Sequence, residues 1–166
     1  MPIPKVKDPA VLELERVVTT QLGIKCSFLE ANLFEANFGL DHMKDVEFPV
    51  FVYFADDKSK YKVKEHGMIT RRMPIVGMLL NQFSNPTIDY SSAEVNADVN
   101  RCRQLVENLV YNLNKSPLSV WEDKEDKGGV DDFETENVYQ KFDAALLGVG
   151  TSFVWRVKTS MGAYTV

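Results

Sequence analysis

Two segments of the chain carry apolar residues at intervals of three and four positions, the spacing that places them on one face of a helix. The first begins at Asp8-Pro9, an N-capping acid followed by a proline suited to the first helical turn, and it ends at Gly23. The second follows Ser91-Ser92, and Glu94 strengthens the capping signal. The sequence therefore predicts helices over about 8–23 and 91–114. The apolar stripe of the second consists of Val95, Val99, Cys102, Val106, Leu109, Val110 and Leu113.

Other segments alternate apolar and polar residues, or are rich in aromatic and β-branched residues, as strands are. Pro74 and Gly77 interrupt one of them, which indicates either a bulge or a strand that is fully paired on one side only. The predicted strands are Ile24–Leu29, Phe48–Ala55, Tyr61–Lys64, Met68–Asn81, a short one near Val138-Tyr139, and Gly148–Lys158.

This order of elements predicts an α+β fold: a mostly antiparallel sheet with two helices packed on one face, in the order α-β-β-β-α-β. The second helix is expected to pack against a sheet containing Val50, Val52, Phe54, Ile75 and Leu79. No repeat or linker divides the chain. We therefore expect a single domain over 1–166, with a flexible N-terminus over about 1–8 and an acidic loop over about 122–136.

Composition narrows the class of protein. Of the 166 residues, 45% are hydrophobic and 26% charged, which is typical of a globular domain and excludes a wholly disordered chain. The longest apolar runs, 49–55 and 74–80, fall far short of the roughly 20 residues that cross a bilayer, so no membrane partner is expected. The two cysteines and the lack of a secretory leader favour a reducing, cytoplasmic setting.

Charge is segregated along the chain, although the net charge is only −5. Residues 122–136 contain eight acids against two lysines, a net charge of −6, and residues 58–72 contain six bases against one acid, a net charge of +5. These stretches are either solvated or complementary surfaces that meet between copies, and the basic one is also the best candidate for nucleic-acid contact. We predict a subunit interface formed by Lys58, Lys60, Lys62, Lys64, Arg71, Arg72, Glu122, Asp123, Glu125, Asp126, Asp131 and Asp132.

Residue types that carry catalysis or bind metals do not cluster in the sequence. His42 and His66 are the only histidines, and neither belongs to a spaced ligand set. Cys26 and Cys102 fall on apolar faces, as buried structural thiols do. There is no glycine-rich phosphate loop, and the acidic stretch lacks the pattern of a calcium loop. We therefore predict no catalytic residue, no cofactor and no metal.

Three pieces of the chain form a recognisable combination. They are the early helix followed by the strand Phe48–Phe54, the Arg-rich strand Thr70–Leu80 that leads to the helix around Val99–Leu109, and the run Tyr139–Phe153, with its Phe-Asp-x-x-Leu-x-Gly-Val pattern. This combination resembles small ring proteins of tailed bacteriophages, namely tail-completion, tail-terminator or neck (head–tail joining) proteins, including those of crAss-like phages. The resemblance covers about three quarters of the chain, and residues 24–45 and the acidic stretch do not match the family pattern.

The resemblance implies a non-enzymatic virion subunit, assembled in the host cytoplasm, that forms a homo-oligomeric ring in the head–tail connector. Its partners would be other neck, portal or tail proteins, and DNA would pass through the lumen without specific binding. Two alternatives remain open. One is an adaptor or scaffold that binds a partner along a sheet edge, and the other is a small ligand-binding domain or enzyme with a site in residues 32–45.

Overall fold

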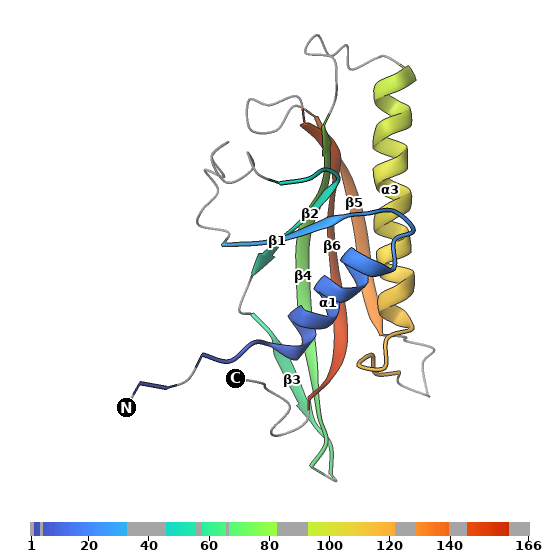
Figure 1. Ribbon diagram of the computed structural model, residues 1–166. Helices are drawn as coiled ribbons and strands as arrows, with labels where there is room; N and C mark the ends of the chain where they lie inside the picture. The colour runs from blue at the N-terminus through green and yellow to red at the C-terminus, as the bar shows by residue number, and fades with distance from the viewer. Residues whose placement is uncertain are drawn as a thin grey trace.

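The computed structural model describes residues 2–3, 5–32, 46–55, 58–65, 67–82, 93–121, 129–139 and 146–159. Within these ranges the chain forms two helices and six strands (Figure 1). The helices are α1 (Pro9–Thr20) and α3 (Ala93–Asn114), and the strands are β1 (Ser27–Asn32), β2 (Val50–Ala55), β3 (Lys60–Val63), β4 (Ile69–Gln82), β5 (Val130–Tyr139) and β6 (Leu146–Thr159).

The six strands form one sheet in the order β1-β2-β4-β6-β5, and β3 pairs with β4 beside this path. β4 and β6 are the spine of the sheet, because both are 14 residues long and pair antiparallel along their whole length. The pair β1–β2 is parallel, and the other described pairs are antiparallel. The predicted α+β class with a mostly antiparallel sheet is confirmed. Four strands precede α3 and two follow it, as the six predicted strand segments indicate, which is one more on each side than the order α-β-β-β-α-β contains.

Pro74 lies within β4, where its missing N–H cannot donate to a neighbouring strand. β2 pairs with residues 76–80 of β4 and β3 pairs with residues 69–72, so no described strand lies beside residues 73–75 on that side. On the other side, β6 pairs with β4 without any shift of register. Of the two predicted alternatives, the strand that is fully paired on one side only is confirmed, and the bulge in β4 is wrong.

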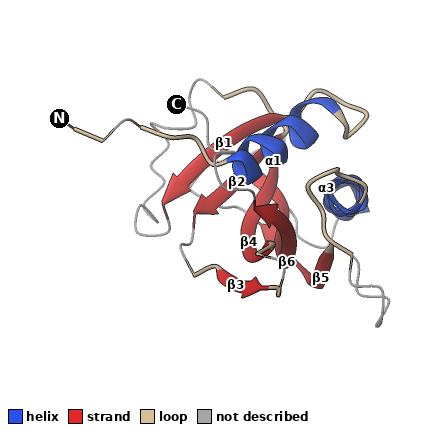
Figure 2. Cartoon of the chain, turned by 90° about the horizontal axis from the view of Figure 1, so that it is seen from below, coloured by secondary structure: helices blue, strands red, loops and turns tan. Residues whose placement is uncertain are grey.

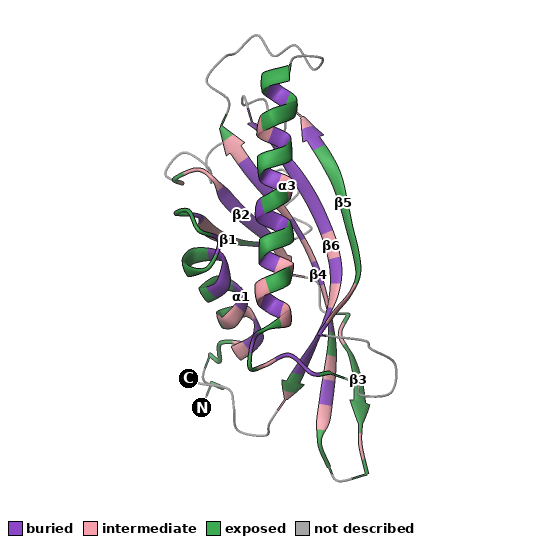
Figure 3. Cartoon of the chain, turned by 90° about the vertical axis from the view of Figure 1, so that its right-hand side faces the viewer, coloured by how far each residue is buried: buried purple, intermediate pink, exposed green. Residues whose placement is uncertain are grey.

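Both helices pack on the same face of the sheet, as predicted (Figure 3). α1 begins where the sequence indicates, since the Asp8 carboxylate accepts a hydrogen bond from the Ala10 N–H at 2.9 Å. α3 buries Val95, Val99 and Val106 of its apolar stripe. On the face that meets the helices, β4 and β6 contribute alternate residues to the same core, including Met73, Ile75, Leu79, Phe153 and Trp155.

The opposite face of the sheet carries a second apolar cluster, built around Val50, Val52 and Leu80. The prediction that Val50, Val52 and Phe54 pack beneath the second helix is therefore wrong: Phe51 and Tyr53 face the helices instead. The physical reason is that β2 is apolar at every position, so an alternation of period two does not reveal which face meets the helices.

Two strands, β1 and β5, differ most from the sequence prediction in their bounds. β1 begins three residues later than predicted, and Cys26 is buried just before it. β5 occupies residues 130–139, so the predicted acidic loop is wrong for residues 130–136; residues 122–128 lie outside the described chain. Because β5 is an edge strand with most of its residues exposed, it shows little of the apolar alternation that reveals a strand.

Candidate subunit interface

The basic stretch forms a hairpin, which we call the basic hairpin: β3, the start of β4 and the turn between them, residues 58–72 (Figure 1). All four residues of β3 are exposed, as are Lys58 and Arg72, whereas Lys64 is half-buried. Two large apolar or aromatic side chains are exposed here too: Tyr61 retains 57% of its accessible surface and Val63 retains 69%. The hairpin therefore presents both charge and apolar area to the outside.

The side chain of Arg71 is tied into the fold by two contacts. Its guanidinium pairs with the Asp8 carboxylate that caps α1, and its Nε donates to the Ser59 hydroxyl at 2.9 Å. Only 12% of the Arg71 side chain is exposed. Arg71 thus holds the basic hairpin against the start of α1.

The described part of the acidic stretch lies on β5, and we call Asp131, Asp132, Glu134 and Glu136 the acidic edge. Asp132, Glu134 and Glu136 are exposed. The Asp131 carboxylate instead forms a salt bridge with the guanidinium of the buried Arg156, with 2.5 Å between Oδ2 and Nη2. The other predicted acids, Glu122, Asp123, Glu125 and Asp126, lie outside the described residues. Glu134 and Glu136 belong to the acidic stretch but not to the residues named for the predicted interface, although their spacing of two indicates that both project from one face of a strand.

A β-bulge interrupts β5 within the acidic edge. The register against β6 shifts between Asp131 and Glu134, and Asp132 has a φ of 52°, in the left-handed region that few residues other than glycine adopt. From Glu134 onward the pairing is regular again up to Tyr139. The regular part of the acidic edge is therefore centred on Glu134 and Glu136.

The basic hairpin and the acidic edge lie on different sides of the β4–β6 spine (Figure 2). β5 ends the strand order on one side, and β3 pairs with β4 on the side away from β6. The two surfaces lie too far apart across the sheet to pair with each other within one chain, so opposite charges of neighbouring copies can attract each other.

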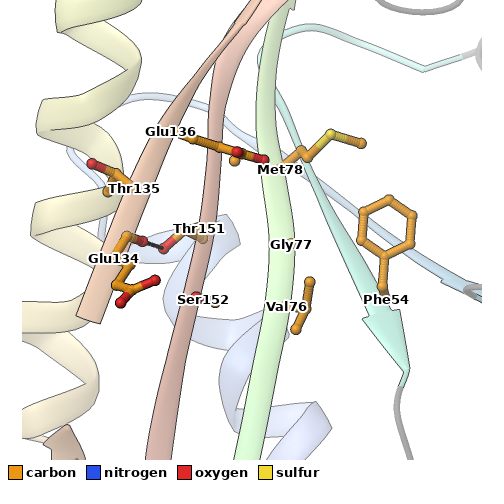
Figure 4. A pocket seen from close by; sticks show the side chains of 10 residues that line it. Phe54, Val76, Gly77, Met78, Glu134, Thr135, Glu136, Thr151 and Ser152 are labelled. Atoms are coloured by element: carbon orange, nitrogen blue, oxygen red, sulfur yellow. Dashed lines mark hydrogen bonds between the residues drawn. The ribbon is translucent and has the colours of Figure 1, made fainter. Parts of the chain in front are cut away.

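The face of the sheet away from the helices also contains a shallow hollow of about 340 Å³ (Figure 4). Its floor includes Gly150 and Ser152 of β6, and Glu134 and Glu136 of β5 border it opposite Met78 of β4. In the described part of the chain, no group of His, Cys, Asp and Glu is arranged to hold a metal ion. Apart from Asn32, the alternative ligand site in residues 32–45 and both histidines lie outside the described residues.

Both thiols are buried in the main core. Burial raises the pKa of Cys26 from 9.0 to about 12 and that of Cys102 to about 11. At pH 8 a thiol with a pKa of about 11 contains about 100-fold less thiolate than a thiol with the ordinary pKa of 9.0. The thiolate is the form that reacts.

We therefore expect both thiols of the native protein to react at least about 100-fold more slowly with a thiol reagent at pH 8 than in denaturant, measured by mass spectrometry. The raised pKa values also predict that stability is retained below pH about 9 and falls as the pH rises toward about 11, because the unfolded thiols ionise first. Rapid native labelling of either cysteine would contradict the buried placement.

Comparison of the chain with known protein families and with curated proteins found no match. Neither α1 nor α3 is long and apolar enough to cross a membrane. The features that bear on function are therefore the two charged sheet edges and the resemblance in the sequence.

Proposed function

We propose that this protein is a structural subunit of a ring in the head–tail connector, or neck, of a tailed bacteriophage. The observation that supports this proposal is that one sheet carries a basic edge at β3 and an acidic edge at β5. Two different surfaces that complement each other on one chain favour head-to-tail association, which produces a ring when the rotation between neighbours closes. The resemblance of residues 48–54, 70–80 and 139–153 to neck and terminator proteins is what favours a place in the neck of the virion.

In this assembly the subunit has no chemistry to perform. Its task is to hold its neighbours at a fixed angle around the axis and to offer surfaces to the portal or tail proteins above and below. Exposed ion pairs are individually weak, so apolar side chains beside them must supply much of the affinity. Tyr61, Val63 and Phe133 lie next to the charges, and Trp121, which is 57% exposed, is a further anchor.

The exposed edge of β5 also favours a second candidate, an adaptor that binds an extended segment of another protein along this edge. The two functions differ in solution. A ring subunit self-associates as its concentration rises, or when its neck partners are present, whereas an adaptor stays monomeric. Light scattering and negative-stain microscopy of the purified protein separate them.

Reversing the charge of the basic hairpin is expected to weaken self-association. We expect the triple variant Lys60→Glu, Lys62→Glu, Lys64→Glu to associate at least about tenfold more weakly and to enter particles poorly, because three attractive contacts become repulsive. The melting temperature of the monomer should change little, since Lys60 and Lys62 are exposed. Sodium chloride at 1 M, which shortens screening to about 3 Å, should reduce the difference between the variant and the native protein.

The matched control carries both reversals, the three lysine changes together with Glu134→Lys and Glu136→Lys. If the two edges meet between copies, this variant regains association because the charges are complementary again. Normal assembly by the triple variant alone would make the basic hairpin a solvated edge and would contradict the role of charge in the ring.

A further inference from the structure

The two charged edges have the same arrangement of side chains across the sheet. On β3, the pairing of Tyr61 with Arg71 places Tyr61 and Val63 on the face that carries the helices, since Arg71 reaches the start of α1 from there. The alternate residues Lys60 and Lys62 therefore project from the opposite face. Charged and apolar residues of β3 thus point to different faces.

β5 repeats this division. Phe133 packs edge-to-face on Phe153, which belongs to the core beneath the helices, and Thr135 pairs with Thr151 on that face. Glu134 and Glu136 project from the helix-free face, where they border the hollow (Figure 4). Both edges therefore carry their charges on the helix-free face and their apolar or uncharged residues on the helix face.

The directions of the strands are also compatible. β4 and β5 both run antiparallel to β6, so they are parallel to each other, and β3 runs antiparallel to β4. β3 and β5 are consequently antiparallel. When neighbouring copies are related by rotation about an axis along the strands, strand direction and sheet face are preserved. The β3 edge of one copy then meets the β5 edge of the next as an antiparallel pair, with the helices on the same side.

Building on the proposed ring, we infer that β3 of one copy adds to the edge of β5 in the next copy and continues the sheet from subunit to subunit. The register sets Lys60 opposite Glu136, Tyr61 opposite Thr135, Lys62 opposite Glu134, and Val63 opposite Phe133. Ion pairs then alternate with apolar contacts, the former on the helix-free face and the latter on the helix face. Among the described residues, neither outer edge is paired with another strand.

Pairings of β3 with β5 that are shifted by one or two residues match the side chains of the two strands less well. A shift of one residue sends the lysines to the face opposite the glutamates. A shift of two toward the end of β5 sets Lys60 against the buried Val138, and Tyr61 against Asn137, which already accepts a hydrogen bond from Arg103. A shift of two the other way places Lys62 and Val63 on the bulge at Asp131 and Asp132. Only the inferred register keeps all four residues of β3 beside Phe133–Glu136.

Site-specific disulfide formation tests the register. Residues directly opposite each other in an antiparallel pair bring their Cβ atoms close enough for a disulfide. We expect a mixture of the Tyr61→Cys and Thr135→Cys variants, and a mixture of Lys62→Cys and Glu134→Cys, to give covalent dimers under mild oxidation. The mismatched mixture of Tyr61→Cys with Asn137→Cys should react at least about tenfold more slowly. Each variant alone is a control, because Cys26 and Cys102 are buried.

The outcomes separate this inference from the proposed ring. If the native protein associates, but the mismatched pair reacts as fast as the matched pairs or no pair reacts, the ring proposal stands and the inferred pairing is overturned. If the protein stays monomeric at every concentration and in the presence of its neck partners, both fail together. Rapid reaction of both matched pairs in an associating protein supports the continuous sheet.

Discussion

The Val106→Asp variant is expected not to fold. Val106 lies in the middle of α3, has no accessible surface and belongs to the core between the helices and the β4–β6 spine. An unpaired carboxylate there loses its hydration and gains no partner, which costs several kcal/mol against a total stability of about 5–15 kcal/mol. Circular dichroism during thermal melting should show loss of the cooperative transition, and expression should yield mostly insoluble protein.

The control for this variant is Asn108→Asp, which introduces the same side chain two positions later, where α3 is exposed. We expect its melting temperature to lie within a few degrees of the native value, because surface substitutions usually change stability by less than about 0.5 kcal/mol. A soluble Val106→Asp protein that melts cooperatively near the native temperature would show that this face of α3 is not part of the core.

The second large effect is expected from a single methyl group at Gly148. A Cβ at this position would lie 1.9 Å from the carbonyl oxygen of Leu79 and 2.9 Å from its carbonyl carbon. These are main-chain atoms of β4, so they cannot move aside without breaking the pairing of β4 with β6. We expect Gly148→Ala to cost about 3 kcal/mol or more and to lower the melting temperature by roughly 6–12 °C.

Gly150 offers a matched control on the same strand. A Cβ at Gly150 would lie 3.1 Å from Cγ of Glu136, a flexible and exposed side chain that can turn away. Gly150→Ala should therefore melt close to the native temperature in the same calorimetric scan. Equal melting temperatures for the two alanine variants would contradict the tight approach of β4 and β6 at Gly148.

The sequence predicts a helix or strand best where a local signal is present and only one face of the element is buried. Asp8-Pro9 marks the start of α1 because the capping carboxylate and the proline act within a single helical turn. The stripe of α3 is recognisable because its polar face is as regular as its apolar face. The apolar run of β4 is long enough to be recognised as a strand despite Pro74.

The prediction fails where a strand has two similar faces or an uncovered edge. β2 is apolar on both sides, so its orientation depends on what covers each face of the sheet. β5 carries acids on its exposed positions, and the bulge at Asp132 breaks the alternation that remains. In both strands tertiary packing, rather than local pattern, decides the structure.

The candidate interface was predictable as two regions of opposite charge, but its detailed composition was not. The pairs Arg71–Asp8 and Asp131–Arg156 join residues that are distant in sequence. Nothing local therefore distinguishes Arg71 and Asp131 from the exposed charged residues beside them. Folding thereby assigns two of the predicted interface residues to contacts within the chain. It also brings Glu134 and Glu136 into the regular part of an outer strand.

The placement of each sign of charge on a separate edge has a consequence for the order of assembly. A two-fold dimer of two β5 edges would set glutamates against glutamates, and one of two β3 edges would set lysines against lysines, which destabilises such strand pairs. In the proposed assembly each productive contact uses one edge of each kind. A growing oligomer then keeps one β3 and one β5 unpaired at its two ends until it closes. Growth therefore has a polarity, and symmetric dimers that would trap subunits are disfavoured.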